Sequence, residues 1–239
     1  MSTNDFSGAP DSPDDMTITT YPSVISVPGA AQRNLGTVTD CLDPLVNGPV
    51  PAKHVLEIAS FPYEHMRGYA KKWPHVHFSG TVRDIDEMEK TSLDGIPGNV
   101  APPEKLDIAI QKDWDALFDT VNDPFDGAIM VNLVHCTPEG LPEHVFRNLS
   151  PLTPEGRRVL APGGWIGVYG AYLNEDGTFR SEGDAKFDAE WIKAVHPSLG
   201  LRSPKDLREM VEKWGWREES QSIVAKGNLF IVFRATIPE

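Results

Sequence analysis

Residues 55–66 constrain the fold of this chain more than any other stretch. They open with an almost unbroken apolar run, 55–59, which is typical of a parallel strand covered on both faces. Ser60 then suits a helix cap, and Pro62 and Glu64 suit the first turn of a helix. The stretch therefore predicts a strand, a tight turn and a helix, the unit from which α/β sheets are built.

The turn in this unit lacks the residues that a nucleotide site at such a place normally has. Nucleotide-like cofactors bind where the first strand of an α/β sheet turns into its helix, and glycines there let the backbone approach the ligand. This turn carries Phe61, Pro62 and Tyr63 instead. Two rings and a residue without an N–H group are therefore expected in the volume that such a cofactor needs.

The rest of the chain continues the alternation of strands and helices. Strands are expected at 53–59, 75–80, 106–109, 125–132, 165–169, 218–224 and 228–234, the last two as a hairpin. Helices are expected at 29–45, 62–73, 85–93, 114–121, 143–158, 187–195 and 204–214. This order predicts an α/β, doubly wound, Rossmann-like fold: a mostly parallel seven-stranded sheet with a C-terminal antiparallel hairpin. Residues 1–28 are polar and read as a flexible N-terminal arm, with one domain at 29–239.

The composition excludes several kinds of partner. A formal net charge of −13 argues against nucleic acid and anionic membranes. No apolar run reaches the roughly 18 residues of a membrane span, and no signal peptide is evident. Cys41 and Cys136 lie far apart, and His75 and His77 lack a third ligand at suitable spacing, so no metal is expected. A reduced, cytoplasmic setting and a small-molecule partner are expected.

Motifs spread over residues 29–234 resemble those of a known family in order and spacing. They are Ala31-Gln32-Arg33-Asn34, Leu56-Glu57-Ile58-Ala59-Ser60 with His65, Leu106-Asp107, Asn132 with His135 and Pro138, Tyr169-Gly170-Ala171-Tyr172, Phe187-Asp188 and Asn228-Leu229. In these motifs the chain resembles the family of methyltransferase-like protein 26 and its bacterial relatives. The turn at 160–165 also resembles the one before strand five of class I S-adenosylmethionine-dependent methyltransferases. Activity in the family is not established, so the resemblance implies a fold more strongly than a reaction.

Two departures from the family pattern concern the cofactor. The family's turn reads Gly-Thr-Gly-Gln-His where this chain has residues 61–65, and the acid that binds the ribose hydroxyls aligns with Thr81. Losing a charged hydrogen bond of that kind forfeits about 1.5–3 kcal/mol. The cofactor motif is thus degenerate. If S-adenosylmethionine binds at all, the residues expected to hold it are Glu57, Ser60, Thr81 and Asp107.

Three residues are candidates for moving protons. His65 lies one turn into the expected helix, where a general acid or base and a capping or packing histidine are about equally favoured. His135 follows the fourth strand at the carboxyl edge of the sheet, where ligands bind in open α/β folds, so a functional role is favoured. Asp188 is a carboxylate on the substrate side in the family pattern. Cys136 is interpreted as a small buried residue, since no base is evident beside it.

Seven further residues are expected to line the substrate-binding site. Arg33 and Asn34 could close over a ligand from the N-terminal helix, or Arg33 could tether that helix to the body through an acid. The others are Phe61, Tyr63, Asn132, Tyr169 and Tyr172. Aromatic core packing is the alternative for Tyr169.

Three functions are compatible with these residues. The first is a pseudo-methyltransferase that binds a small, largely apolar organic substrate without conventional use of S-adenosylmethionine and catalyses a cofactor-free cyclisation, isomerisation or addition in small-molecule biosynthesis. The second is a S-adenosylmethionine-dependent small-molecule methyltransferase. The third is a non-catalytic binding protein. Methyltransferase-fold proteins often pair, which leaves a homodimer open.

Overall fold

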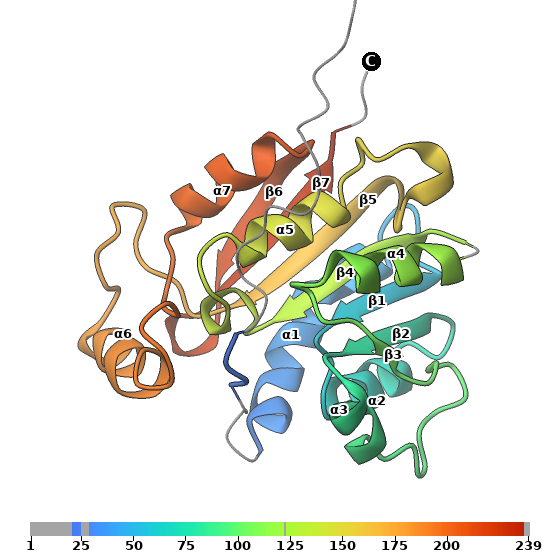
Figure 1. Ribbon diagram of the computed structural model, residues 1–239, viewed down its shortest axis with the longest axis horizontal. Helices are drawn as coiled ribbons and strands as arrows, with labels where there is room; N and C mark the ends of the chain where they lie inside the picture. Colours follow the sequence, from blue (N-terminus) through green and yellow to red (C-terminus); the bar gives the residue numbers. More distant parts are fainter. Residues whose placement is uncertain (1–20, 25–28, 122, 237–239) are drawn as a thin grey trace, which may run out of the picture.

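The computed structural model describes residues 21–24, 29–121 and 123–236, and a seven-stranded sheet runs through its centre (Figure 1). The strands are β1 (His54–Ile58), β2 (His77–Val82), β3 (Glu104–Lys105), β4 (Phe125–Val131), β5 (Leu160–Gly170), β6 (Trp216–Ile223) and β7 (Leu229–Ala235). Their order is β3-β2-β1-β4-β5-β7-β6, with β7 antiparallel to β5 and β6 and the other pairs parallel. The predicted doubly wound sheet with its terminal hairpin is confirmed.

Helices cover both faces of this sheet (Figure 1). They are α1 (Ala30–Val46), α2 (Glu64–Lys72), α3 (Ile85–Lys90), α4 (Gln111–Thr120), α5 (Leu141–Asn148), α6 (Glu182–Phe187), which continues into a π-helical turn at Asp188–Ile192, and α7 (Pro204–Glu212). The buried residues of α4, α5 and α7 share one core cluster, and those of α1 and α2 share the other. The sheet is therefore the middle of three layers, as doubly wound folds require.

The central strands are apolar because both of their faces are covered. In β1 every residue after His54 is buried, and β4 is buried along most of its length. β1 pairs with β2 on one side and with β4 on the other, so its carboxyl end lies in the middle of the sheet edge. In a sheet whose strand order reverses beside β1, this is the place where ligands bind.

Several boundaries differ from the expectation, and for three of them the local reason is clear. β3 is only Glu104–Lys105, and the apolar residues after it enter a turn in which Ile110 N donates to Asp107 O. β5 begins already at Leu160, because a register shift in its pairing with β4 accommodates the Pro-Gly-Gly segment. α5 ends at Asn148, shortly before Pro151, since a residue preceding proline avoids the helical region.

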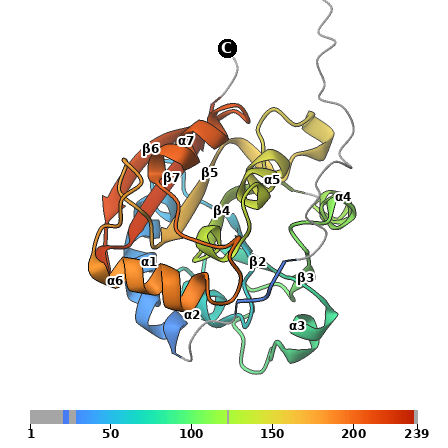
Figure 2. The same ribbon diagram turned by 60° about the vertical axis from the view of Figure 1, so that its left-hand side comes forward.

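The N-terminal arm is described only at residues 21–24, which lie against the body beside β2 and β3 (Figure 2, blue segment). The flexibility predicted for residues 1–20 and 25–28 concerns positions outside the described residues. His144 is buried against Trp114 and Arg147. Within the described ranges, no helix is both long and apolar enough to cross a membrane.

Candidate active site

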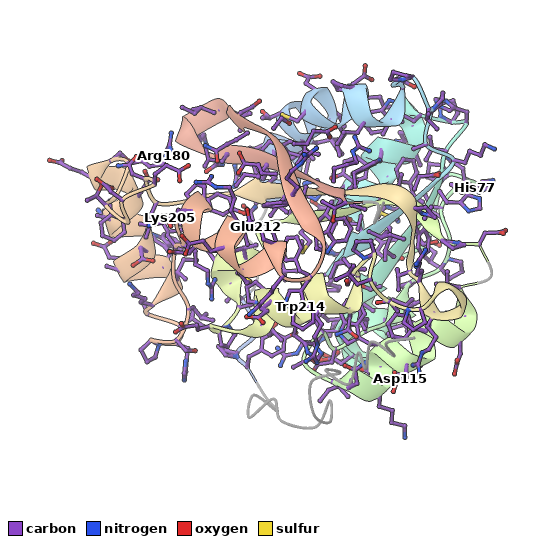
Figure 3. The ribbon with its side chains drawn as sticks, turned by 90° about the horizontal axis from the view of Figure 1, so that it is seen from above. His77, Asp115, Arg180, Lys205, Glu212 and Trp214 are labelled. Carbon is purple, nitrogen blue, oxygen red and sulfur yellow. The ribbon has the colours of Figure 1, made fainter. Side chains whose placement is uncertain are left out.

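A cavity of about 250 Å³ opens at the carboxyl ends of β1 and β4. Its floor comes from the turn after β1 and the first turn of α2, one side from residues after β4, and its roof from the start of α1 and residues 21–24. Of the residues predicted for the site, those that line the cavity are Asn34, Glu57, Ser60, Phe61, His65 and Asn132. His77, at the amino end of β2, lies at the opposite end of the molecule from Arg180 (Figure 3).

The turn after β1 keeps its backbone donors for itself. Ser60 N donates to Thr81 O at 2.7 Å, and Tyr63 N donates to Ser60 O at 2.6 Å. Pro62, which follows a cis peptide bond, has no N–H group. The row of free amides that a glycine-rich turn presents to a ligand is therefore largely missing here.

The two rings of this turn point in different directions, which corrects the expectation that both fill the cavity. Phe61 is half-buried and lines the cavity. Tyr63 adopts the left-handed conformation, with φ of 72°, and its fully buried ring donates a hydrogen bond to Gly80 O at 2.8 Å. A Cβ on residue 80 would lie 2.8 Å from the Tyr63 hydroxyl oxygen, so Gly80 is required for this ring to pass. Tyr63 therefore belongs to the core below β1 and β2.

Thr81 also acts on the turn from below. Its Oγ1 accepts from Ala59 N at 3.1 Å and its side chain is fully buried, outside the cavity lining. Thr81 thus holds the end of β1 in place.

Glu57, His65 and Tyr69 form a connected polar cluster at the floor. The Glu57 carboxylate is buried, with Oε1 3.5 Å from His65 Nδ1 and 3.3 Å from the Tyr69 hydroxyl that donates to it. The Tyr69 ring is stacked on the His65 ring, with centroids 5.8 Å apart and planes inclined by 8°. Among the described residues, Glu57 Oε2 and His65 Nε2 have no hydrogen-bond partner. Both residues line the cavity, and both unpartnered atoms are buried beside it, which is an arrangement that calls for an explanation.

The backbone around the cavity is strained at two residues that are not glycine. Ala59 after β1 and Asn132 after β4 have φ of 59° and 57°. The left-handed region costs an L-residue such as alanine about 1–2 kcal/mol, and such residues cluster at functional sites. The strain lies at the two strand ends that frame the cavity.

A second polar group, of which the sequence predicted only Asp107, lies where β2 and β3 end. Arg83 lines the cavity, and its Nε lies 3.6 Å from Asp107 Oδ2. The Arg83 guanidinium also lies 3.9 Å from the centroid of the Tyr21 ring. The position of Arg83 directly after β2 was the available signal, because ligands bind at that edge. Nothing in the spacing pointed to Tyr21.

His135 and Asp188, predicted to act with His65, lie outside this cavity. His135 is buried against Phe187 and hydrogen-bonded to the Ala171 backbone; burial, followed by the nearby Arg202, lowers its pKa to about 4. Asp188 accepts from Leu201 N at 2.7 Å and pairs with Lys193 Nζ at 2.6 Å. The structure therefore separates these two residues from His65 and ties both into local packing.

The remaining predicted residues, Tyr169, Tyr172 and Arg33, also lie outside the cavity lining. The Tyr169 hydroxyl accepts from Asn228 at 2.7 Å and donates to Asn34 at 3.4 Å, which fixes α1 against β5. Tyr172 is buried in the core, and Arg33 is exposed on α1, both outside the cavity lining. The hydroxyl of Tyr172 and Nε2 of His144 also lack a partner among the described residues.

Cysteine and metal chemistry have little support at this site. Cys136 lines the cavity, but burial raises the pKa of its thiol to about 12, so the thiol stays protonated at neutral pH. No group of three or more potential metal ligands occurs in the part of the chain that the structure describes.

Comparison with solved structures gives methyltransferase folds. Human N-acetylserotonin methyltransferase, solved in complex with SAM, matches with a TM-score of 0.66 and 13% identity over 87% of this chain and 53% of its own. The mitomycin 7-O-methyltransferase MmcR matches with a TM-score of 0.66 and 15% identity over 86% of this chain and 54% of its own. This chain thus spans about half the length of either protein. At such identities the likeness shows the fold alone.

Two further matches cover most of the chain. The putative methyltransferase solved in complex with the Trm112 methyltransferase activator of Haloferax volcanii matches with a TM-score of 0.61 and 14% identity, over 87% of this chain and 93% of its own. A family model described as "Protein of unknown function (DUF938)" matches residues 26–235.

Proposed function

Because this chain belongs to the DUF938 family, whose function is unknown, we propose its function from the site itself. The protein is an enzyme of methyltransferase fold that binds a small, largely apolar organic substrate in the cavity. It converts this substrate without conventional use of S-adenosylmethionine, by a cyclisation, isomerisation or addition. The narrower resemblance to methyltransferase-like protein 26, a cytoplasmic setting and a homodimer stay predictions.

The observation that carries the proposal is the Glu57–His65 pair at the cavity floor. The carboxylate beside Nδ1 favours the imidazole tautomer with its proton on Nδ1, which leaves Nε2 as an unpartnered lone pair that is buried beside the cavity His65 lines. Stacking on Tyr69 fixes the plane of the ring. A histidine oriented in this way is suited to general acid–base catalysis, which contributes roughly 10²–10⁴-fold to a rate.

The step needs no external reagent. His65 Nε2 removes a proton from an acidic C–H or O–H of the substrate, and Glu57 stabilises the imidazolium that forms. The electron pair left on the substrate shifts to form the new bond or double bond. The imidazolium then returns the proton at another atom, so that in a cyclisation, an isomerisation or an intramolecular addition the substrate and product are isomers and the enzyme is restored.

S-adenosylmethionine in its usual pose fits these residues poorly. The Phe61 side chain lines the cavity beside the turn, and amides of the turn, those of Ser60 and Tyr63, are used internally. Beyond β2, where a carboxylate would accept from ribose hydroxyls, Arg83 lies against Tyr21. Glu57 Oε2 is the one free acceptor in this set that suits an ammonium group. No step is therefore assigned to this cofactor.

A S-adenosylmethionine-dependent small-molecule methyltransferase is the second candidate. Its support is that acids remain near the carboxyl end of β1 and after β3, Glu57 and Asp107, on a fold whose neighbours include a methyltransferase solved with SAM. A non-catalytic binding protein, the third candidate, would use the same cavity without proton transfer.

The experiment separates the three candidates with the full-length protein. A ligand released from the purified protein is identified by mass spectrometry and its conversion is followed with and without S-adenosylmethionine. The proposal expects turnover without the cofactor, no methyl gain in the product, and at least a 100-fold loss in His65→Gln but not in the control His135→Gln. Methyl transfer from labelled cofactor contradicts it, and so does binding that persists without any turnover.

A further inference from the structure

The side-chain amide of Asn34 belongs to the cavity lining and has no role in the reaction proposed above. Its Oδ1 accepts a hydrogen bond from the Tyr169 hydroxyl at 3.4 Å. That hydroxyl accepts from Asn228 Nδ2 at 2.7 Å, so its single proton is directed to Asn34. Two residues outside the cavity lining therefore fix which way the Asn34 amide is turned.

The nitrogen of this amide, Nδ2, is open to a ligand. Because Oδ1 is the atom bound to Tyr169, Nδ2 is left without a partner among the described residues. The buried side-chain atoms that lack a partner do not include it, and Asn34 as a whole is half-buried, so Nδ2 is accessible. The cavity lining thus contains an N–H donor whose natural partner is an oxygen acceptor.

The packing of α1 on α2 places this donor near His65. Leu35 lies against Gly68, where a Cβ would be 2.4 Å from Leu35 Cδ2. Farther along both helices, Lys72 Nζ lies 3.3 Å from Asp40 Oδ1. The contacts follow the same order in both helices, so α1 and α2 run in the same direction. Their N-terminal ends, which carry the donor and His65, lie side by side.

A donor and a base on neighbouring helix ends suit a substrate with a carbonyl group. When a base removes a proton from the carbon beside a carbonyl, negative charge develops on the carbonyl oxygen, and a positioned donor stabilises that charge. We propose that Asn34 Nδ2 donates to a carbonyl oxygen of the substrate, and that the substrate is an apolar ketone with a C–H group beside that carbonyl. This inference rests on the proposed function and names its substrate class.

The step balances within the substrate and His65. Nε2 takes the proton from the α-carbon, the C–H electron pair forms a C=C bond, and the π pair of the carbonyl moves to oxygen to give an enolate. Asn34 donates a hydrogen bond to that oxygen and keeps its own protons. The imidazolium then returns the proton to carbon, so in deuterium oxide the α-hydrogen is replaced by deuterium.

Two probes of the same shape test the donor by itself. Cyclohexanone carries the acceptor, and methylenecyclohexane has a CH₂ group in place of the oxygen. The preference for cyclohexanone is the ratio of the two dissociation constants, measured by ligand-observed NMR with the full-length protein. Asn34→Asp keeps Oδ1 for Tyr169 and loses the donor, and we expect this preference to fall by about fivefold or more. Asn34→Ala is expected to show the same fall.

Two further variants separate the donor from its support. Tyr169→Phe keeps the ring and removes the hydroxyl that orients the amide, so this positioning residue is expected to lower the preference by about threefold. The control Asn47→Ala replaces an asparagine at the other end of α1, where its side chain donates to Asp43. It is expected to leave the preference unchanged.

Exchange of the α-hydrogens of cyclohexanone for deuterium, followed by NMR, tests the chemistry. The wild type is expected to accelerate it, Asn34→Asp to slow it by about tenfold, and His65→Gln to abolish the acceleration. The inference is overturned if the preference is the same in the wild type, Asn34→Asp and Asn34→Ala, or if cyclohexanone does not bind. A preference that falls as expected, with exchange no faster in the wild type than in His65→Gln, contradicts the proposed function and leaves the carbonyl contact of Asn34 intact.

Discussion

His65 and His135 both lie near the carboxyl edge of the sheet, yet their surroundings are opposite. His65 faces the cavity beside a buried carboxylate, and Nε2 of the ring and Oε2 of that carboxylate have no partner among the described residues. His135 is packed behind the edge and hydrogen-bonded to the backbone, while the neighbouring Asp188 has partners for both of its oxygens.

The difference separates residues that await a ligand from residues that hold the fold. A buried polar atom without a partner costs stability, so such atoms need a reason to be present. At His65 and Glu57 the reason is the cavity that both residues face. Both Asp188 oxygens have partners inside the protein, and the His135 ring is hydrogen-bonded to the backbone and packed on Phe187, which indicates structural roles.

The largest expected effect is a loss of stability when Asp188, one of the residues that hold the fold, is replaced. Asp188→Ala leaves the Leu201 amide without its acceptor in a buried place and Lys193 without its partner. We expect the free energy of unfolding, measured by urea titration, to fall by about 3 kcal/mol. A loss below about 1 kcal/mol would show that the two interactions do not tie this region together.

The second effect is a pH dependence of the free energy of unfolding that comes from His135. The pKa of His135 is lowered to about 4, against about 6.5 when unfolded. Below pH 6.5 the unfolded chain therefore binds a proton that the folded chain does not, and stability falls with falling pH until about pH 4. Between pH 7.5 and 5 we expect His135 to contribute a loss of about 2 kcal/mol.

Comparison of variants isolates this contribution from the other titrating groups. His135→Gln should lose about 2 kcal/mol less than the wild type between these pH values. His144, whose pKa burial also lowers to about 4, remains in both proteins and cancels. If His135→Gln loses as much free energy of unfolding between pH 7.5 and 5 as the wild type does, the result contradicts the buried neutral state of His135.

The third prediction compares Glu57→Gln with Asp188→Asn, each of which replaces a carboxylate by an amide of the same shape. The two substitutions are expected to change stability in opposite directions. Glu57→Gln removes a buried charge with one unpartnered oxygen and keeps the acceptor for Tyr69, so we expect stability to rise by about 1 kcal/mol. Asp188→Asn removes a paired charge, so we expect a fall of about 1 kcal/mol. Thermal melts at pH 7.5 measure both, and a loss of stability in Glu57→Gln would argue that the cavity pair is structural.

The smallest effect concerns the two rings of the turn. Tyr63→Phe removes the hydrogen bond to Gly80 O and should cost about 1 kcal/mol of stability without changing ligand affinity. Phe61 lines the cavity. The substitution Phe61→Ala should therefore change the free energy of ligand binding by more than it changes the free energy of unfolding. The reverse pattern, seen by calorimetry and melts, would mean that Tyr63 reaches the ligand.

Most of the fold could be predicted, because apolar runs and turns determine it. The run in β1 and the alternation that follows gave the parallel sheet, and the terminal hairpin gave its antiparallel edge. The start of β5 was missed because Pro162 is followed directly by Gly163 and Gly164, which locally indicate a turn. Only the partner strand β4 shows that the chain is already paired there.

The site could be predicted in part. The strand–turn–helix pattern predicted that His65 and Glu57 lie near the carboxyl end of the first strand, and both residues line the cavity there, since their position follows from local structure. The direction of Tyr63 depends on a left-handed backbone angle and on Gly80, 17 residues away. The contact of Tyr21 with Arg83 joins residues 62 apart and leaves no periodic signal in the sequence.

The most direct measurement is a crystal structure of the wild-type protein grown with excess S-adenosylmethionine. The account predicts that Phe61 keeps its place in the cavity, that Tyr21 stays on Arg83, and that no cofactor density lies against residues 60–63. Clear density for S-adenosylmethionine along Glu57 and Ser60, with its base at Asp107, would contradict it.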